Sequence, residues 1–238
     1  MDTYRPARRR GPANIADHWI RADILKWRLF IPFVNRRDLL ERALRSASTR
    51  EVIVIDNSEC RELYGDENFR AEYEVLCASV PLSFSQTMNY MIGIADSLSL
   101  DIYLFMHNDA EIVGDGFERF LCLIQELPSN WGAAFTNFDT LAAFNMAAVR
   151  QVGLWDWVRF PQYFAETDYY HRMRLSGFET IWVDDVDVIH HNEGSNTIKS
   201  DKVRMHVENM LSKTYLKMYV HKWGGKPESE RFIEPRMF

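Results

Sequence analysis

The sequence contains few cysteines and no long apolar run. Three cysteines occur in 238 residues, at Cys60, Cys77 and Cys122, with no CxxC or cysteine–histidine metal spacing. This odd, scattered set fits free thiols in a reducing compartment better than a disulfide framework. No stretch reaches the roughly 18 apolar residues of a transmembrane helix, and no apolar signal segment follows the N-terminal charges. We therefore expect no transmembrane segment and a cytoplasmic location, with peripheral association with a membrane left open.

Glycine-rich nucleotide-binding motifs are also missing. The sequence has no GxxxxGK[ST] loop, no GxGxxG after the first expected strand and no GxSxG turn. The first absence excludes a P-loop NTPase, and the second argues against a nicotinamide-dependent Rossmann enzyme. A bound nucleotide would therefore have to be held by side chains and a metal ion.

An excess of positive charge is lacking too. The net charge is −6, which gives no indication of nucleic-acid binding, and 47% apolar with 26% charged residues is typical of a globular protein. One basic cluster, Arg5, Arg8, Arg9 and Arg10, stands near the N-terminus. We expect residues 1–24 to form a flexible basic segment, and leave open its binding to an anionic surface or partner.

Apolar runs alternate with helical repeats along the rest of the chain. Strands are expected over residues 27–31, 52–55, 74–79, 101–106, 131–138 and 181–188, and helices over 36–47, 83–98, 117–127, 141–153, 165–177 and 200–221. Pro32 is expected to end the first strand, and Ser85 to cap the second helix. The alternation predicts an α/β fold with a doubly wound, mostly parallel sheet.

The chain shows no internal repeat and no low-complexity linker. We expect one domain over residues 25–198, with residues 199–238 forming a helix and a strap that pack on it. On that helix, Val203, Val207, Leu211 and Tyr215 repeat every four residues and are expected to face the domain.

Polar side chains follow two of the expected strands. Asp56 and Asn57 follow the second strand, and the run from His107 to Asp109 follows the fourth. Ligands of open α/β sheets bind outside the carboxyl ends of the strands. Both groups are therefore expected to face the same crevice.

Four further residues add to this candidate site. Glu166 and Asp168 open an expected helix, and His190 and His191 end a late strand. With Asp109 they form a mixed set of oxygen and nitrogen donors that suits Mn²⁺ or Mg²⁺. Taken singly, a turn, the helix dipole or a surface hydrogen bond also explains each of them. Only their joint occurrence in this order indicates a site.

Six segments, taken in order, resemble the family 2 glycosyltransferases, which have the GT-A fold. They are FIPFVNRRDLLERALRS, EVIVIDNSE, FSQTMNYMIGIA, YLFMHNDAEI, VRQVGLWDWVRFPQYFAETDYYHRMRLSGFE and VIHHNEGS. The similarity runs from Leu29 to Ser195. It implies a GT-A sheet with flanking helices and an inverting glycosyltransferase of the hexosyltransferase type. The implied partners are a UDP-, GDP- or dTDP-sugar donor, a divalent cation (Mn²⁺ or Mg²⁺), and a glycan, lipid-linked or protein acceptor.

The resemblance also implies roles for individual residues. Asp109 matches the metal-binding DxD position, and His190 and His191 match the histidine position that completes the metal site. Glu166 matches the general base, with Asp168 as the alternative. The acceptor would lie near Trp155 and Asp156. The donor would lie against Pro32, Phe33, Asn35, Asp56, Asn57, Asn89, His107 and Asn108.

Two positions depart from the family pattern. His107 replaces the first Asp of DxD, and Ala165–Glu166 replaces the Glu–Asp pair, so the base would be a glutamate. One alternative is a catalytically inactive relative that binds a nucleotide sugar or a glycan. A sugar nucleotidyltransferase is disfavoured because the loop PFVNRRD contains no glycine. A purely structural α/β domain would leave the polar strand ends unexplained.

Overall fold

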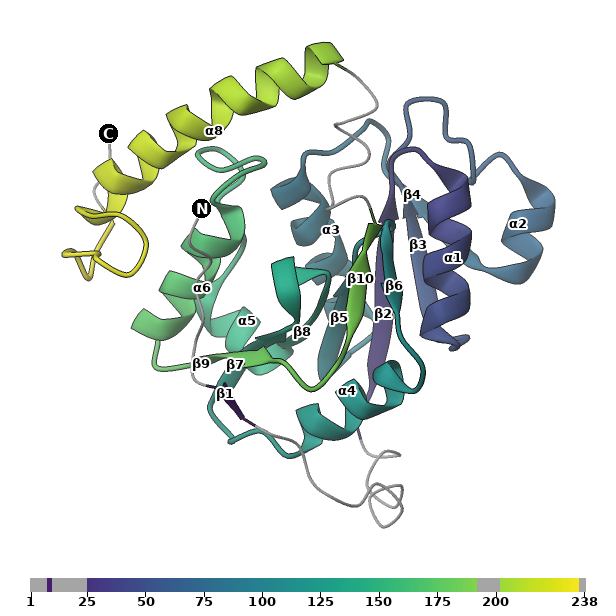
Figure 1. Ribbon diagram of the computed structural model, residues 1–238, viewed down its shortest axis with the longest axis horizontal. Helices are drawn as coiled ribbons and strands as arrows, with labels where there is room; N and C mark the ends of the chain where they lie inside the picture. Colours follow the sequence, from purple (N-terminus) through teal and green to yellow (C-terminus); the bar gives the residue numbers. More distant parts are fainter. Residues whose placement is uncertain (1–7, 10–24, 192–201, 236–238) are drawn as a thin grey trace.

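The computed structural model describes residues 8–9, 25–191 and 202–235 and shows an α/β fold around one eight-stranded sheet (Figure 1). The strand order is β1-β9-β7-β8-β5-β2-β3-β4, and only β8 runs antiparallel to its neighbours. The expected α/β class and mostly parallel sheet are confirmed. The strands are β1 (Arg8–Arg9), β2 (Trp27–Phe33), β3 (Val52–Asp56), β4 (Glu74–Cys77), β5 (Ile102–Met106), β7 (Trp131–Phe135), β8 (Leu141–Asn145) and β9 (Glu179–Val183).

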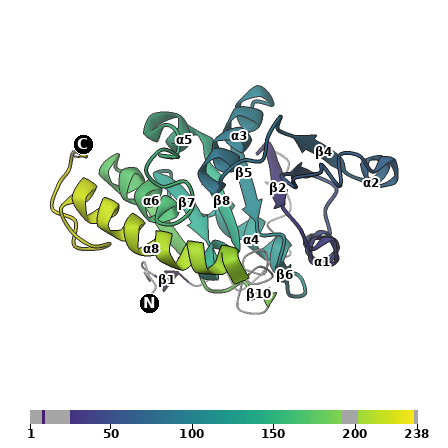
Figure 2. The ribbon, with the colours of Figure 1, turned by 90° about the horizontal axis from the view of Figure 1, so that it is seen from above.

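Helices cover both faces of the sheet, with α1 on one side and α3 and α5 on the other (Figure 2). Side chains therefore alternate between two buried layers: Leu29 and Ile31 of β2 pack with α1, whereas Phe30 packs with α3. The helices are α1 (Arg37–Ala47), α2 (Glu67–Glu72), α3 (Phe84–Ser97), α4 (Gly116–Gln125), η1 (Asn137–Asp139), α5 (Met146–Val152), α6 (Ala165–Leu175) and α8 (Lys202–Trp223).

A second, two-stranded sheet lies in front of the first. β6 (Ala110–Ile112) pairs antiparallel with β10 (Val188–His190), and His190 lies opposite Ala110. This pairing brings the end of a late strand to the polar segment that follows β5. It therefore joins two of the predicted polar groups at the carboxyl end of the main sheet.

Pro32 does not end the first strand, and that prediction was wrong. β2 continues through Pro32 to Phe33. The backbone groups of Leu29 and Phe33 form their hydrogen bonds toward β3. Since successive residues of a strand alternate in direction, the nitrogen of Pro32 faces β5, and β2 pairs with β5 only as far as Phe30. The missing N–H of proline therefore leaves no ladder hydrogen bond unmade.

The predicted cap Ser85 and the predicted helix over residues 141–153 were also wrong. Ser83 caps α3 in a reciprocal capping box with Gln86, whereas the Ser85 hydroxyl donates to the Phe160 carbonyl. Leu141–Asn145 form β8, which inserts between β5 and β7, and only Met146–Val152 are helical. Pairing on both sides outweighs the helix propensity of the alanines in this segment.

The C-terminal helix α8 runs along one end of the molecule (Figure 1). Tyr215, Tyr219 and Trp223 are buried in the layer that contains α3, α5 and α6. Val207 is 46% exposed, so its expected burial was wrong, and the side chain of Val203 lies outside the described residues. No helix in the described part of the chain is both long and apolar enough to cross a membrane.

The N-terminal segment is described only at Arg8 and Arg9. These two residues pair in parallel with Trp182 and Val183 of β9. The rest of the expected flexible segment, residues 1–7 and 10–24, lies outside the described residues. The predicted division of the chain at residues 24 and 198 stays a prediction.

Candidate active site

His107, Asp109 and His190 form a group of metal-capable side chains at the carboxyl end of the sheet. One ligand atom from each lies within 4.8 Å of the others. His190 Nε2 is 3.2 Å from Asp109 Oδ1, and His107 Nδ1 is 3.8 Å from the same oxygen. Two imidazole nitrogens and a carboxylate oxygen at this spacing make a donor set that can bind a divalent metal ion.

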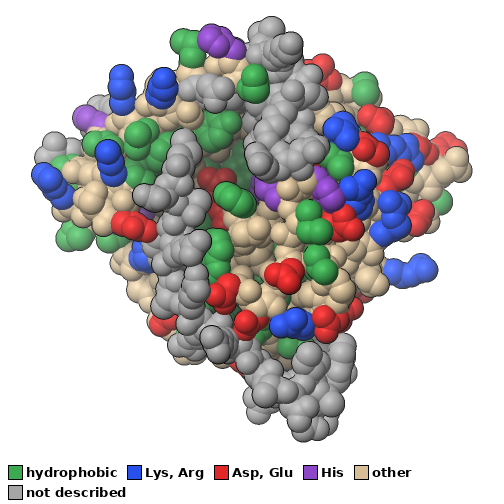
Figure 3. All heavy atoms as spheres, in the orientation of Figure 1, with side chains coloured by type: hydrophobic (Ala, Val, Ile, Leu, Met, Phe, Trp, Pro, Cys, Tyr) green, Lys and Arg blue, Asp and Glu red, His purple; other side chains and the backbone are tan. Residues whose placement is uncertain are grey.

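The backbone brings these three residues together from distant parts of the chain. The Ala110 N–H donates to the His107 carbonyl, which closes a turn around Asp109. The His191 N–H donates to the Asp109 carbonyl, which holds β10 beside this turn. In the space-filling view, histidine side chains gather near the middle of this face, with acidic and basic side chains beside them (Figure 3).

His107 is held in the neutral form that a metal ligand requires. Withdrawal from water lowers its pKa to about 4, the neighbouring His190 adds to this effect, and Asp109 opposes it. Its ring meets that of His190 edge to face, with the centroids 5.2 Å apart. His107 therefore stays uncharged at neutral pH.

His191, the other predicted metal ligand, lies outside this group. Its Nε2 is 2.7 Å from Glu111 Oε2, and its Nδ1 is 3.2 Å from the guanidinium of Arg42. Arg42 is also 3.9 Å from Glu111. The side chain of His191 thus belongs to a neighbouring polar cluster on α1 and β6.

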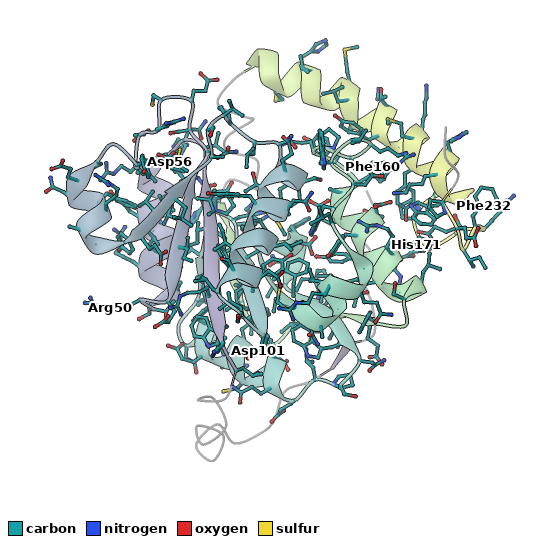
Figure 4. All side chains as sticks on the ribbon, turned by 180° about the vertical axis from the view of Figure 1, so that it is seen from behind. Arg50, Asp56, Asp101, Phe160, His171 and Phe232 are labelled. Carbon is teal, nitrogen blue, oxygen red and sulfur yellow. The ribbon has the colours of Figure 1, made fainter. Side chains whose placement is uncertain are left out.

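The predicted donor-binding residue Asp56 lies at the carboxyl end of β3, at the opposite end of the sheet from Arg50 and Asp101 (Figure 4). It is 2% exposed. One carboxylate oxygen accepts from the N–H and the hydroxyl of Ser58, and the other accepts from the N–H groups of Leu63 and Tyr64. In this structure Asp56 therefore orders the loop after β3, and its contact with a nucleotide stays a prediction.

Three predicted donor-binding asparagines also hold backbone segments. Both amide atoms of Asn57 bond Leu82, and both amide atoms of Asn89 bond the backbone of Trp155. Asn108 donates to the carbonyl of Asn35 at 3.0 Å. Two further predicted residues, Pro32 and Phe33, form the end of β2. In this structure the three asparagines thus hold neighbouring backbone segments, and their contact with a donor stays a prediction.

Of the two predicted acceptor residues, Trp155 packs on α6 and Asp156 contacts α8. Trp155 is 2% exposed, and its ring stacks on Tyr169 at 4.3 Å. Asp156 Oδ2 is 2.8 Å from Lys222 Nζ and 3.0 Å from Arg159. Burial raises the pKa of this carboxyl, but these hydrogen bonds outweigh burial and lower it overall.

The two candidate bases on α6, Glu166 and Asp168, have opposite surroundings. Asp168 is 1% exposed and accepts from Arg172, from Trp223 Nε1 at 2.8 Å and from Lys222 at 2.7 Å. Among the described residues no cation pairs with Glu166, and withdrawal from water raises its pKa to about 7. Asp168 is thus a structural ion-pair residue, whereas Glu166 is poised to take up a proton near neutral pH.

Asp139, at the end of η1, is a candidate that the sequence reasoning missed. Burial and the charge of Glu166 raise its pKa well above the ordinary value. Burial and the charges of Asp139 and Glu166 likewise raise the pKa of Tyr170 on α6. The only signal in the sequence was the acid in TNFD after a strand, which reads as an ordinary turn residue.

Comparison with solved structures shows the fold to which this site belongs. Glucosyl-3-phosphoglycerate synthase from Mycobacterium tuberculosis, in complex with Mn²⁺, UDP and phosphoglyceric acid, is 13% identical. It matches with a TM-score of 0.57 over 87% of this chain and 84% of that chain. GalNAc-T7 with UDP, GalNAc and Mn²⁺ is 12% identical, with a TM-score of 0.56 over 70% of this chain and 44% of that one.

The mannosyltransferase PcManGT from Pyrobaculum calidifontis, in complex with GDP-Man and Mn²⁺, is 12% identical. Its TM-score is 0.52 over 66% of this chain and 54% of that chain. The chain thus spans about half the length of GalNAc-T7 and of the mannosyltransferase. No protein-family model matches the chain, and no curated protein sequence matches it. The likeness confirms the expected GT-A fold, and the assignment to family 2 stays a prediction.

Proposed function

We propose that this protein is a metal-dependent glycosyltransferase that moves a sugar from a nucleotide diphosphate sugar to a hydroxyl group of an acceptor. The observation that carries the proposal is the group of His107, Asp109 and His190 at the carboxyl end of a GT-A sheet. Nucleotide ligands and Mn²⁺ are named in the complexes of similar fold. Glu166, a candidate base whose pKa is raised to about 7, lies on the helix α6.

His107, Asp109 and His190 would hold the divalent cation. When bound, the cation neutralises the diphosphate and makes it a better leaving group. The carboxylate of Asp109 supplies the negative charge of the site, and the neutral ring of His107 leaves a nitrogen lone pair for coordination. His190 reaches the same point because of the β6–β10 pairing.

Glu166 would act as the general base. As the acceptor oxygen forms its bond with the anomeric carbon, the bond from that carbon to the diphosphate breaks, and the electron pair leaves with the diphosphate. The acceptor proton passes to the Glu166 carboxylate. A base with a pKa near the working pH is well matched to this transfer, and attack opposite the leaving group inverts the anomeric centre.

The proposal is tested by nucleotide release. The wild-type chain is incubated with UDP-, GDP- and dTDP-sugars, with and without Mn²⁺, and the free nucleotide diphosphate is measured. We expect slow release from one donor class, dependent on Mn²⁺, because water replaces the absent acceptor. Binding of a nucleotide sugar without release would instead make the chain an inactive relative. In a second assay the chain is given a sugar phosphate and a nucleotide triphosphate, and release of pyrophosphate there would make it a nucleotidyltransferase.

A further inference from the structure

The turn between β7 and β8 carries an exposed aromatic side chain. Phe138 is 64% exposed, whereas Trp155 and Tyr169 in the neighbouring buried layer are at most 2% exposed. A single exposed apolar side chain is common on protein surfaces and indicates nothing by itself. The backbone of the turn, its anchoring and its position distinguish Phe138 from such residues.

The backbone of this turn suits small or polar residues better than a phenylalanine. The Thr140 N–H donates to the Asn137 carbonyl at 3.1 Å. The two residues between them, Phe138 and Asp139, have φ angles of 52° and 53°. These are the features of a type I′ hairpin turn, whose central positions favour asparagine, aspartate and glycine. A bulky side chain is unfavourable at a positive φ, so local stability does not explain the phenylalanine.

Hydrogen bonds fix this turn to both segments that supply the metal-capable group. The His107 N–H donates to the Thr140 carbonyl at 3.0 Å. The side-chain amide of Asn137 donates to the carbonyl of Val188 at 3.4 Å, on the strand β10 that ends in the third member of the group. The backbone therefore holds Phe138 in a defined place beside the metal-capable side chains.

The ring of Phe138 lies next to that group. Its centroid is 6.2 Å from the centroid of the His190 ring, at an interplanar angle of 46°. His190 Nε2 is in turn 3.2 Å from Asp109 Oδ1. In a nucleotide sugar the anomeric carbon is bonded directly to the diphosphate. A sugar whose diphosphate is held at this group therefore comes within reach of the exposed phenyl ring.

We propose that Phe138 binds the donor sugar by packing its exposed ring against the apolar C–H face of the sugar ring. The inference rests on the proposed function and names a residue that holds the sugar of its donor. One face of a pyranose presents mainly C–H groups, and burying them against an aromatic ring removes apolar surface from water. The contact is non-directional, so it holds the ring without selecting its hydroxyl groups.

Binding of two related ligands tests the proposal. The Kd values of the nucleotide diphosphate and of its nucleotide sugar are measured by calorimetry with Mn²⁺. We expect Phe138→Asn to raise the Kd of the nucleotide sugar about three- to tenfold, the size of one aromatic ring contact, and to leave that of the nucleotide diphosphate unchanged. Phe138→Tyr, which keeps the ring, should change neither value. Leu98→Ala, at an exposed apolar residue that follows α3, is the control.

Thermal unfolding separates this role from a structural one. Because asparagine is favoured in a type I′ turn, Phe138→Asn should unfold at the wild-type temperature or above it. A lower unfolding temperature, together with equal losses of affinity for both ligands, would make Phe138 a structural residue and would overturn the proposal. An unchanged Kd of the nucleotide sugar in Phe138→Asn would also overturn it, while leaving the proposed function intact.

A separate measurement decides the case in which the wild type binds no nucleotide and the proposed function fails. Saturation-transfer nuclear magnetic resonance is then recorded with the methyl glycosides of glucose, galactose and mannose. Transfer that Phe138→Asn loses and Leu98→Ala keeps would retain Phe138 as a sugar-binding residue. No transfer to any glycoside, or equal transfer in the wild type and in Phe138→Asn, would overturn the proposal.

Discussion

Two adjacent histidines, His190 and His191, bind different partners, and this difference gives a matched test of the metal site. His190 lies 3.2 Å from Asp109, whereas His191 bonds Glu111 at 2.7 Å. We predict that His190→Ala weakens Mn²⁺ binding by more than the roughly 10–100-fold typical of losing an outer-shell partner. His191→Ala should weaken it less, measured by the electron paramagnetic resonance of free Mn²⁺. Equal effects of the two substitutions would contradict the assignment of His190 as the ligand.

Glu166 sets the pH dependence of the proposed reaction. The base must be ionised to accept a proton, and its pKa is raised to about 7, so activity is present above this pH and is lost as the pH falls through it. We predict that kcat/KM of the wild type rises about tenfold per pH unit below this point and then levels off. The rate of donor turnover from pH 5 to 9 measures this profile.

Removing the carboxylate gives the companion prediction. Glu166→Gln should lower kcat by about 10²–10⁴-fold and abolish the rise near pH 7. The affinity for the nucleotide should change little, because Glu166 acts on the acceptor. A variant that keeps both the rate and the rise near pH 7 would show that another group is the base.

The individual residues were predictable to different degrees. Asp109 and Glu166 stand at positions that sequence motifs mark, at a strand end and at a helix start. Sequence reasoning favoured Glu166 and kept Asp168 as the alternative, because the cations that surround Asp168 come from the distant α8 and from Arg172. Asp139 was missed because its neighbour Glu166 is far away in the chain and meets it only in the folded structure.

At the scale of the elements, one buried lysine connects α8 with α6 and with the loop after α5. Lys222 is 3% exposed and lies 2.8 Å from Asp156 and 2.7 Å from Asp168. The next residue, Trp223, packs against His171, and its carbonyl accepts from the N–H of Phe232. His171 and Phe232 are labelled in Figure 4. The helix therefore neutralises two acids, one on the loop after α5 and one on α6.

This arrangement predicts a large loss of stability for Lys222→Ala. The substitution would remove the buried cation that Asp156 and Asp168 share, whereas Arg159 and Arg172 would still pair with them. The expected loss is therefore at or below the roughly 3–5 kcal/mol that breaking a buried ion pair typically costs. Denaturant unfolding measures the change, and Lys226→Ala, at an exposed lysine four residues further on, is the control. A loss no larger than that of the control would contradict a role for Lys222 in holding α8.

The elements that were predicted correctly have periodicity that is visible locally. α1 and α6 begin and end within two residues of the predicted bounds. β8 was mistaken for helix because alanines favour a helix, and its pairing with β5 and β7 is a tertiary effect. The network of Lys222 was likewise invisible, since a lysine in a helix usually faces water.

At the scale of the whole molecule, the alternation of strands and helices predicted the mostly parallel α/β sheet, and the resemblance of six segments to glycosyltransferases predicted that this sheet has the GT-A fold. Consecutive βαβ units have one preferred hand, and their strand ends meet at one edge of the sheet, so the fold and the place of the site follow together. The antiparallel pairing of β6 with β10 did not follow from this rule. Yet this pairing is what adds His190 to the pair of His107 and Asp109.

The most direct test of the account is a calorimetric titration of UDP, GDP and dTDP, with and without Mn²⁺, on the wild type and on Asp109→Ala. Asp115→Ala, at an exposed acid that makes no capping hydrogen bond at the start of α4, controls for the loss of a charge. We predict that one nucleotide binds in the presence of Mn²⁺, that Asp109→Ala abolishes this binding and that Asp115→Ala preserves it. Binding of no nucleotide, or binding that depends on neither Mn²⁺ nor Asp109, would contradict the account.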